Sequence, residues 1–494
     1  MRCARKPWPP RIASRPPNRR TGSRRCCTSS SSRPASRRCV EERTMDRLSR
    51  RKFLRSAAAG GLLYAFGRTP GSILAHAAGV NGYSDYKALV CVFLYGGNDS
   101  WSMVVPRSQA EYDAYAAARR NLAIARDALL PIAPTNGGDY GMHPSMAGLA
   151  SLFEAGRLAV IPNVGPLVAP TTLAQYRAKT VPLPPQLFSH NDQQGQWQTL
   201  RGEAPSKTGW AGRMADLMAA QLGGQQLATN VSLSGATVLQ AGESATPYVM
   251  GESGPQTFKA FGTTGLAAER RAAFERLLAA GQPSVYGRGY AEVHERAIAN
   301  ATLVNAALAG APTMATSFPT GSSLATQLRT VARLIAVREQ LGMSRQVFFV
   351  ATGGFDTHDD QLENQPSLLA NVSASLAAFH AATVELGIAD AVTTFTNSDF
   401  GRSLSSNGDG SDHAWGGVQF VMGGSVAGRA FYGEYPELRM GAPLDVGGGR
   451  LIPTTSSDQF VATLARWFGV SDSQLGTIAP SLENFAEKNL GFMA

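Results

Sequence analysis

The sequence predicts an α/β fold in which a doubly wound, mostly parallel sheet is flanked by helices. Five apolar runs have the length of strands and are continuous rather than alternating, as in parallel sheets that are covered on both faces. Helical patterns lie between these runs, and repeated strand–helix–strand order is typical of doubly wound sheets. The predicted strands cover residues 88–95, 158–164, 346–352, 391–398 and 418–424.

Amphipathic patterns predict the helices that separate or follow these strands. Residues 145–156 precede the second strand and end at a glycine. Residues 322–342 and 366–387 have apolar residues at helical spacing, and the second of these begins at a proline. Residues 457–469 are predicted to form a capped amphipathic helix near the end of the chain. Residues 235–320 mix loops with two helical stretches, so we expect an inserted cap over the ligand edge of the sheet.

The first 78 residues are predicted to precede the folded domain, which spans 79–494. Residues 1–44 carry 13 Lys/Arg against 2 Asp/Glu without periodicity, so we expect disorder and attribute them to a start upstream of Met45. Residues 45–78 contain SRRKFL, then AAAGGLLYAF, then AHA, which is the pattern of a signal peptide. The paired Arg50 and Arg51 are typical of twin-arginine export.

The alternatives for this segment are an ordinary secretory signal or a membrane anchor. Its apolar stretch is shorter than the ~20 residues that a stable span needs. We therefore expect passage through the twin-arginine translocase, a periplasmic or extracellular location, and no stable membrane span.

The charge of the chain is concentrated in the predicted leader. The whole sequence carries +10, but residues 1–78 account for +16, which leaves −6 for residues 79–494. A mildly acidic domain has no electrostatic reason to bind nucleic acid or anionic lipid. Cys91, the one cysteine of that domain, lies in an apolar run and is predicted to be a core residue.

Acidic residues and histidines recur where the predicted strands end. The segments GGNDSW, GGFDTHDDQ, SDFGRS and GSDHAWGG supply the candidate metal ligands, which are Asp99, Asp356, His358, Asp399 and His413. Carboxylate and imidazole together suit Zn, Mn or Fe better than Ca or Mg. Two carboxylates ~4 Å apart repel by roughly 4 kcal/mol at an effective dielectric near 20, so converging carboxylates favour a divalent metal. The alternative is that these aspartates cap helices and turns.

The segment FSHNDQQGQWQ supplies the candidate catalytic residues, Ser189 and His190. A serine at a helix N-terminus can present its oxygen to a metal and hold an oxyanion on backbone N–H groups. The alternative is that Ser189 only caps the helix.

The motifs GGNDSW, LFSHNDQQ, GGFDTHDDQ and FTNSDFGRS, together with the export signal, resemble a bacterial family known as domain of unknown function 1501. The resemblance covers nearly all of residues 45–494. The same segments are more distantly similar to the alkaline phosphatase and sulfatase superfamily. That resemblance implies that Asp99 is a first-strand metal ligand, that Ser189 is the nucleophile, and that Asp356, His358 and His413 are further ligands. Phe400 departs from it, because the superfamily has a metal-binding histidine at that position.

These observations lead to hypotheses from different functional classes. The first is metal-assisted hydrolysis of a phosphate or sulfate ester, with a small molecule or a glycan as substrate. The second is a non-catalytic periplasmic or cell-surface binding protein on a degenerate sulfatase-like fold, which Phe400 favours. A third is an envelope assembly protein. The sequence leaves the substrate, the identity of the metal and the oligomeric state open.

Overall fold

The computed structural model describes residues 82–202, 206–223, 225, 227–256 and 261–494. The predicted disordered segment 1–44 and the predicted signal peptide 45–78 lie outside the described residues.

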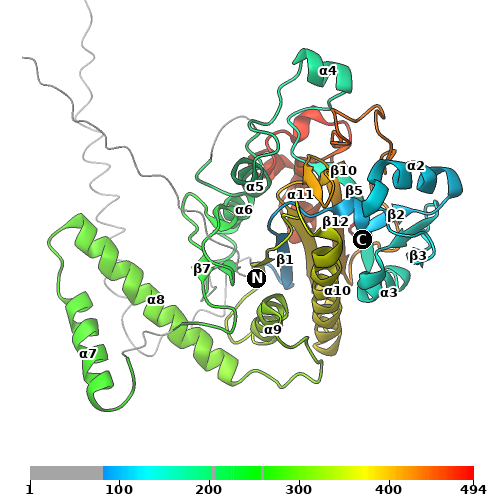
Figure 1. Cartoon of the computed structure of the whole chain (residues 1–494). Coiled ribbons are helices and arrows are strands. Elements are labelled where there is room, and N and C mark those ends of the chain that lie inside the picture. The colour runs from blue at the N-terminus through cyan, green and yellow to red at the C-terminus, as the bar shows by residue number, and fades with distance from the viewer. Residues whose placement is uncertain (1–81, 203–205, 224, 226, 257–260) are drawn as a thin grey trace, which may run out of the picture. The chain divides into compact units, whose positions relative to one another are not determined.

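An eight-stranded sheet organises the described domain (Figure 1). Neighbouring strands run parallel except at β12, which is antiparallel to β5 and β9. A hairpin rather than a crossover helix joins β9 to β12, and only a crossover returns the chain in parallel. The predicted fold class is confirmed. The order across the sheet is β13 (Thr455–Ser456), β5 (Leu158–Gly165), β12 (Gly417–Gly423), β9 (Val392–Ser398), β1 (Lys87–Leu94), β8 (Arg345–Thr352), β6 (Asn230–Ser232) and β7 (Tyr248–Val249).

Successive side chains of β1 enter two different cores, one on each face of the sheet. Ala88, Val90, Val92 and Leu94 belong to one core, and Leu89, Cys91 and Phe93 belong to the other. The first core contains α3 (Ala147–Glu154), α9 (Ser323–Ala336) and α10 (Gln361–Glu385). The second contains α5 (His190–Thr199), α6 (Trp210–Met218), α11 (Ser457–Phe468) and α12 (Leu475–Ile478).

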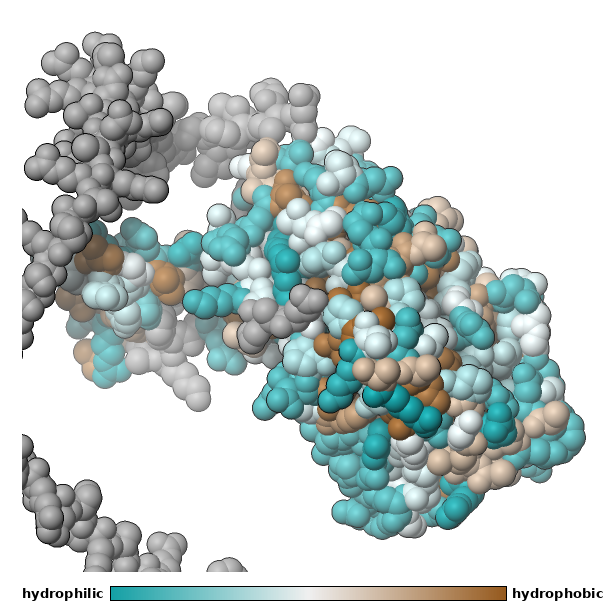
Figure 2. Space-filling view, turned by 90° about the horizontal axis from the view of Figure 1, so that it is seen from above, coloured by the Kyte–Doolittle hydropathy of each residue, from teal (hydrophilic) through white to brown (hydrophobic). Residues whose placement is uncertain are grey.

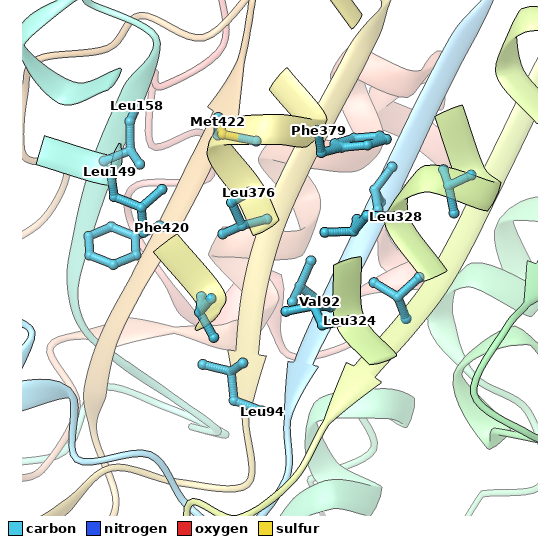
Figure 3. Close-up of a cluster of buried hydrophobic side chains, with 14 of the residues drawn as sticks. Val92, Leu94, Leu149, Leu158, Leu324, Leu328, Leu376, Phe379, Phe420 and Met422 are labelled. Carbon is cyan, nitrogen blue, oxygen red and sulfur yellow. The ribbon is translucent and has the colours of Figure 1, made fainter. Parts of the chain in front are cut away.

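Leucine and phenylalanine side chains fill the first core (Figure 3). Val92 of β1 lies beside Leu324 of α9, and Leu94 of β1 and Leu376 of α10 belong to the same core; each of the four is at most 1% exposed. Burial of one such side chain contributes about 1.5–3 kcal/mol. The packing of these helices against β1 therefore positions the end of the strand and the loop that follows it.

The helix α10 begins earlier than the sequence pattern predicts. It starts at Gln361 and contains Pro366, where we predicted the first residue. Gln361 donates to the Asp99 carboxylate, and Gln365 donates to the Asp99 carbonyl at 2.8 Å. These bonds, one helical turn apart, hold the extra turn although Pro366 lacks an N–H.

Among the described residues, α10 is the one helix that is long and apolar enough to cross a membrane by length and composition. Half of its apolar window is buried inside the protein. Its Leu369, Val372, Leu376 and Phe379 pack in the first core, so the apolar character of α10 is accounted for by that packing.

The predicted cap segment, 235–320, contributes the edge strand β7 to the sheet. It continues as a hairpin of α7 (Gly265–Ala279) and α8 (Val285–Ala309). The end of α8 joins the first core through Val304 and Leu308, and Arg333 of α9 donates to the Leu308 carbonyl at 2.9 Å. The hairpin exposes hydrophobic residues among hydrophilic ones (Figure 2). Its position over the ligand edge stays a prediction.

Smaller elements complete the described fold. A three-stranded sheet has the order β2 (Val104–Pro106), β4 (Tyr140–Met142) and β3 (Leu130–Ile132), and a hairpin pairs β10 (Arg402–Ser406) with β11 (Ser411–His413). Two further helices are α2 (Gln109–Arg119) and α4 (Leu173–Ala178). Short 3-10 helices are η2 (Ser100–Ser102), η3 (Arg120–Leu122), η4 (Pro144–Met146), η5 (Val238–Gln240), η6 (Ala389–Ala391), η7 (Asp472–Gln474) and η8 (Leu482–Asn484).

Candidate metal centre

Three loops meet at the carboxyl ends of the neighbouring strands β1, β8 and β9. The loop after β1 is tied to the loop after β9, because the Gly96 N–H donates to Asp399 Oδ2 at 3.1 Å. Arg402 ties all three: it donates to the carbonyls of Gly96 and Gly97 after β1, and to that of Phe355 after β8. The clustering of strand-end residues expected from a parallel sheet is therefore observed.

His190, the first residue of α5, is oriented by a buried carboxylate. Its Nδ1 lies 2.5 Å from Oδ2 of Asp399, whose side chain is fully buried. Because a carboxylate only accepts, Nδ1–H donates, and the neutral form of the ring then has its electron pair on Nε2. Gln194, one turn along α5, also donates to Asp399 Oδ2 at 3.2 Å. Asp399 thus fixes the ring of His190.

His413, at the end of β11, is oriented by a backbone carbonyl. Its Nδ1 donates to the Phe188 carbonyl at 2.8 Å, which leaves its Nε2 as an acceptor. Phe188 has a φ of +73°, in the left-handed region that a bulky side chain rarely adopts. Strain of this kind persists only where the surroundings impose it, and here it accompanies a carbonyl aimed at His413.

Asp356, after β8, is held by a guanidinium. Arg402 Nη2 contacts Asp356 Oδ1. Arg402 lies opposite His413 in the β10–β11 hairpin, which brings the two side chains to the same carboxylate. The other Asp356 oxygen, Oδ2, is 3.5 Å from His190 Nε2. Asp356 therefore bridges the arginine and the histidines.

The side chains of His190, Asp356 and His413 form the candidate cation site. One ligand atom from each lies within 4.8 Å of the other two. Ligands bound at about 2.0–2.2 Å can stand up to ~4.4 Å apart, so small side-chain movements suffice. His190 Nε2 is buried and makes no hydrogen bond with the described residues. Two imidazoles and a carboxylate, each with a partner behind it, fit Zn, Mn or Fe.

The net charge of the cluster also fits a divalent cation. Asp356, Asp399 and Asp412 supply three carboxylates, and Arg402 supplies one guanidinium. When all four are ionised, the net charge is −2. One divalent cation neutralises it, and this relieves the mutual repulsion of the carboxylates.

His358 lies beside the three candidate ligands but is not one of the three. Its Nε2 is 2.8 Å from His413 Nε2 and 3.2 Å from Asp356 Oδ1, while its Nδ1 is 3.3 Å from Asp412. Since His413 carries its proton on Nδ1, the hydrogen between the two Nε2 atoms belongs to His358. The His358 Nε2–H therefore donates to the electron pair of His413 Nε2, and this hydrogen bond has to break before His413 can bind a cation.

Burial and charge move the pKa values of these groups in different directions. Burial raises the pKa of Asp399, although bonds from His190 and Gln194 oppose it. Burial also opposes ionisation of Asp356, but Arg402 outweighs it and lowers the Asp356 pKa. Burial, together with the nearby guanidinium of Arg402, lowers the pKa of His413, although the hydrogen bond to the Phe188 carbonyl opposes this. A neutral His413 is the form that can bind a cation.

Asp99 departs from the expectation that all five candidate metal ligands share one pocket. Its carboxylate contacts Arg119 Nη2, accepts from Ser102 Oγ at 2.8 Å, and accepts from Gln361. Asp99 and Arg119 are both fully buried. The metal-ligand role predicted for Asp99 stays a prediction, and this pairing disfavours it.

Ser189 is the N-cap residue of α5 and immediately precedes His190. Its hydroxyl donates to Asp192 Oδ2 at 2.6 Å and makes no capping hydrogen bond to the backbone. The catalytic roles predicted for Ser189 and His190 stay predictions. Asp192 supplies an acceptor for the Ser189 proton and was not among the predicted site residues.

Phe400 fills the space beside the cluster with hydrocarbon. It is 2% exposed, and its ring centroid lies 4.8 Å from that of His190 and 4.6 Å from that of His413. A Cβ on Gly97 would lie 2.2 Å from the ring, so Gly97 makes room for it. Phe400 thus supports both imidazoles without offering a donor atom.

Several site residues were missed from the sequence. Gln194 could have been found, because it lies four residues after His190 on a predicted helix and so shares its face. Asp412 adjoins His413 in the quoted motif. Arg119 gave no signal, because nothing in its local sequence indicates that α2 folds back on Asp99.

Comparison with known proteins places the chain in a family. A family model described as "Protein of unknown function (DUF1501)" matches residues 86–477, so the chain belongs to that family. A search of curated proteins found no match.

Solved structures give distant matches. The lipoteichoic acid synthase LtaP from Listeria monocytogenes is 10% identical, with 76% of this chain and 77% of that one covered and a TM-score of 0.30. The soluble domain of lipooligosaccharide phosphoethanolamine transferase A from Neisseria meningitidis is 9% identical, with coverage of 84% and 96% and a TM-score of 0.32. The sulfatase PsFucS1 from Pseudoalteromonas sp. is 10% identical, with coverage of 90% and 76% and a TM-score of 0.32. At these scores the likeness carries no argument about the site.

Proposed function

We propose that this protein is a metal-dependent hydrolase of phosphate or sulfate esters, carried by small molecules or glycans. One observation carries the proposal: His190, Asp356 and His413 present their ligand atoms within 4.8 Å of one another at the carboxyl end of the sheet. Three protein ligands that leave coordination positions open are typical of catalytic metal sites.

A bound divalent cation would polarise an ester oxygen and lower the pKa of an adjacent hydroxyl or water. The chain itself supplies orientation, since Asp399, the Phe188 carbonyl and Arg402 each hold one of the three ligands. The N-terminus of α5 carries partial positive charge, which favours an anionic ester beside Ser189.

Ser189 is the proposed nucleophile and Asp192 its base. The Ser189 oxygen bonds to phosphorus or sulfur as its proton passes to Asp192, 2.6 Å away. The bond to the ester oxygen breaks, and the alcohol leaves with that proton. Water then releases phosphate or sulfate and restores the serine hydroxyl.

The test is to assay Zn²⁺- and Mn²⁺-loaded protein against nitrophenyl phosphate and nitrophenyl sulfate. Ser189→Ala should abolish turnover and retain bound metal, whereas Asp356→Ala should lose both. Wild-type protein that binds metal and hydrolyses neither ester would contradict the proposal, as would full activity in Ser189→Ala.

The second candidate function is a non-catalytic binding protein, and Phe400 favours it. Its ring lies against both His190 and His413, where a further polar group could have acted on substrate. On this alternative, phosphate or sulfate esters raise the melting temperature of the metal-loaded protein without being consumed. Thermal shift and product assay on the same sample distinguish the two functions.

We also propose export by the twin-arginine route, on the strength of Arg50 and Arg51 in SRRKFL. Replacing both with lysine should retain the protein in the cytoplasm of a bacterial host with a working translocase. Equal export of the double variant would contradict this route.

A further inference from the structure

We infer that this centre holds one divalent cation and not a pair, an inference that rests on the proposed function. The sequence offered more than enough donors for two cations: Asp99, Asp399 and His358 in addition to the three ligands. In the folded domain, Oδ2 of Asp99 and Oδ2 of Asp399 are already hydrogen-bonded within the chain, whereas Oδ1 of each is buried and makes no hydrogen bond with the described residues.

Asp99 is the first group withdrawn. Arg119, itself fully buried, neutralises it, and Ser102 and Gln361 donate to the same oxygen, Oδ2. A cation beside Asp99 would face the Arg119 guanidinium at close range, and two positive charges in a low-dielectric interior repel strongly.

Oδ2 of Asp399 is not available to a second cation, because it already orients His190. Its Oδ2 receives hydrogen bonds from His190 Nδ1, Gln194 and the Gly96 N–H. A carboxylate behind a histidine in this way fixes the ring and increases the basicity of Nε2. Through Oδ2, Asp399 is thus a positioning residue for His190, while its buried Oδ1 makes no hydrogen bond with the described residues.

Phe400 occupies a further position beside the three candidate ligands. Its ring stands against His190 and His413 and replaces what could have been a donor by hydrocarbon. The net charge of the cluster also favours one cation: one divalent cation brings the charge of −2 to zero, and a second would leave an uncompensated +2 in a partly buried site.

The two adjacent histidines provide a matched pair for the test. His413 and His358 have their Nε2 atoms 2.8 Å apart, and both side chains are partly exposed, at 24% and 39%. Only His413 is in the three-ligand set. Chelator-treated full-length protein would be titrated with Zn²⁺ by calorimetry, and bound Zn²⁺ per chain would be measured after dialysis.

Wild-type protein should bind one Zn²⁺ per chain. His413→Ala should lose it on dialysis, His358→Ala should keep one, and Asp399→Asn should keep one with an affinity ~10–100-fold weaker. Circular dichroism and a melting curve establish that each variant is folded. Two Zn²⁺ per wild-type chain, or loss of Zn²⁺ in His358→Ala, would overturn the inference and leave metal-dependent hydrolysis standing. No Zn²⁺ in wild-type protein would instead contradict the proposed function.

Discussion

The neighbouring strands β1 and β8 are followed by the same pattern, Gly-Gly-X-Asp, but the two aspartates reach opposite environments. Asp99 and its partner Arg119 are both 0% exposed. Asp356 is 48% exposed, while its partner Arg402 is 0% exposed. Each arginine contacts its aspartate through Nη2. Sequence pattern and ion pairing are therefore alike, and the surroundings differ.

The difference shows how one local motif yields a structural pair in one place and a candidate functional group in the other. Oδ2 of Asp99 is contacted by donors that belong to the chain, and the Arg119 guanidinium balances its charge within the fold. Asp356 has one oxygen turned to His190 and is half-exposed, so a ligand can complete its coordination. A buried ionised carboxylate needs a partner that balances its charge, whereas a partly exposed carboxylate can exchange its partners.

The largest expected effect comes from breaking the buried ion pair of Asp99 and Arg119. Arg119→Ala should lower the free energy of unfolding by about 3–5 kcal/mol, because it leaves Asp99 buried and uncompensated. Urea denaturation measures the loss. The matched control is Arg107→Ala, which removes a 2.9 Å pair with Asp139 whose side chains are 25% and 47% exposed, and should cost less than about 1 kcal/mol. Equal losses would mean that Asp99 is not balanced by Arg119.

The next effect concerns a buried carboxylate that no arginine contacts among the described residues. Asp458 accepts from the Ser481 N–H at 2.9 Å, and burial raises its pKa to about 7, although Arg213 and Arg201 oppose this. As pH rises from about 4 to about 7, the unfolded state ionises first, so stability falls by up to roughly 4 kcal/mol.

Asp458→Asn removes this titration and keeps an acceptor for Ser481. The variant should show a flatter stability profile between pH 4 and pH 7, measured by urea denaturation at several pH values. An unchanged slope in that window would show that Asp458 is ionised in the fold. Asp458 would then be no example of a buried carboxyl group that is neutral for lack of an arginine partner, and the contrast with Asp99 would be lost.

A smaller effect separates the two motifs by their response to metal. Zn²⁺ at one hundred times its dissociation constant should stabilise wild-type protein by about 2.7 kcal/mol. Asp356→Asn should lose that increment. Asp99→Asn should keep it, although the variant itself is less stable. Thermal unfolding with Zn²⁺ and with chelator measures both, and the reverse pattern would exchange the roles of the two aspartates.

The sheet was predictable because its strands are continuous apolar runs. The predicted strand 346–352 became β8 (Arg345–Thr352), and 158–164 became β5 (Leu158–Gly165). The two-residue strands β7 and β13 were not predicted, because pairing at the sheet edge, and not their own hydrophobic pattern, makes them strands.

The site was predictable only in part. Residues that end parallel strands share one edge, and this placed Asp356 and Asp399 together. The role of each residue depended on partners far away in the chain. Arg119 acts on Asp99 across 20 residues, and His190 acts on Asp399 across 209. Local sequence cannot tell a neutralised aspartate from an available one.

The smallest expected effect tests the glycines of the two motifs. Gly96 has a φ of +116°, and a Cβ there would lie 2.4 Å from the Asp356 backbone nitrogen. Gly353 lies outside the left-handed region, and a Cβ there would come no nearer than 4.0 Å, to Tyr95. Gly353→Ala should therefore raise the free energy of unfolding by about 0.4–1 kcal/mol, because it restricts the unfolded chain.

Gly96→Ala is the matched control for that change. It should destabilise the protein and weaken Zn²⁺ binding together, because the new methyl group displaces the backbone that carries Asp356. Urea denaturation and Zn²⁺ titration of both variants make the comparison. If Gly96→Ala leaves Zn²⁺ affinity unchanged, the β1 loop does not position Asp356, and the two motifs are independent. If both substitutions lower the free energy of unfolding equally, the loop after β8, which carries Asp356, is as tightly constrained as the loop after β1, which carries Asp99.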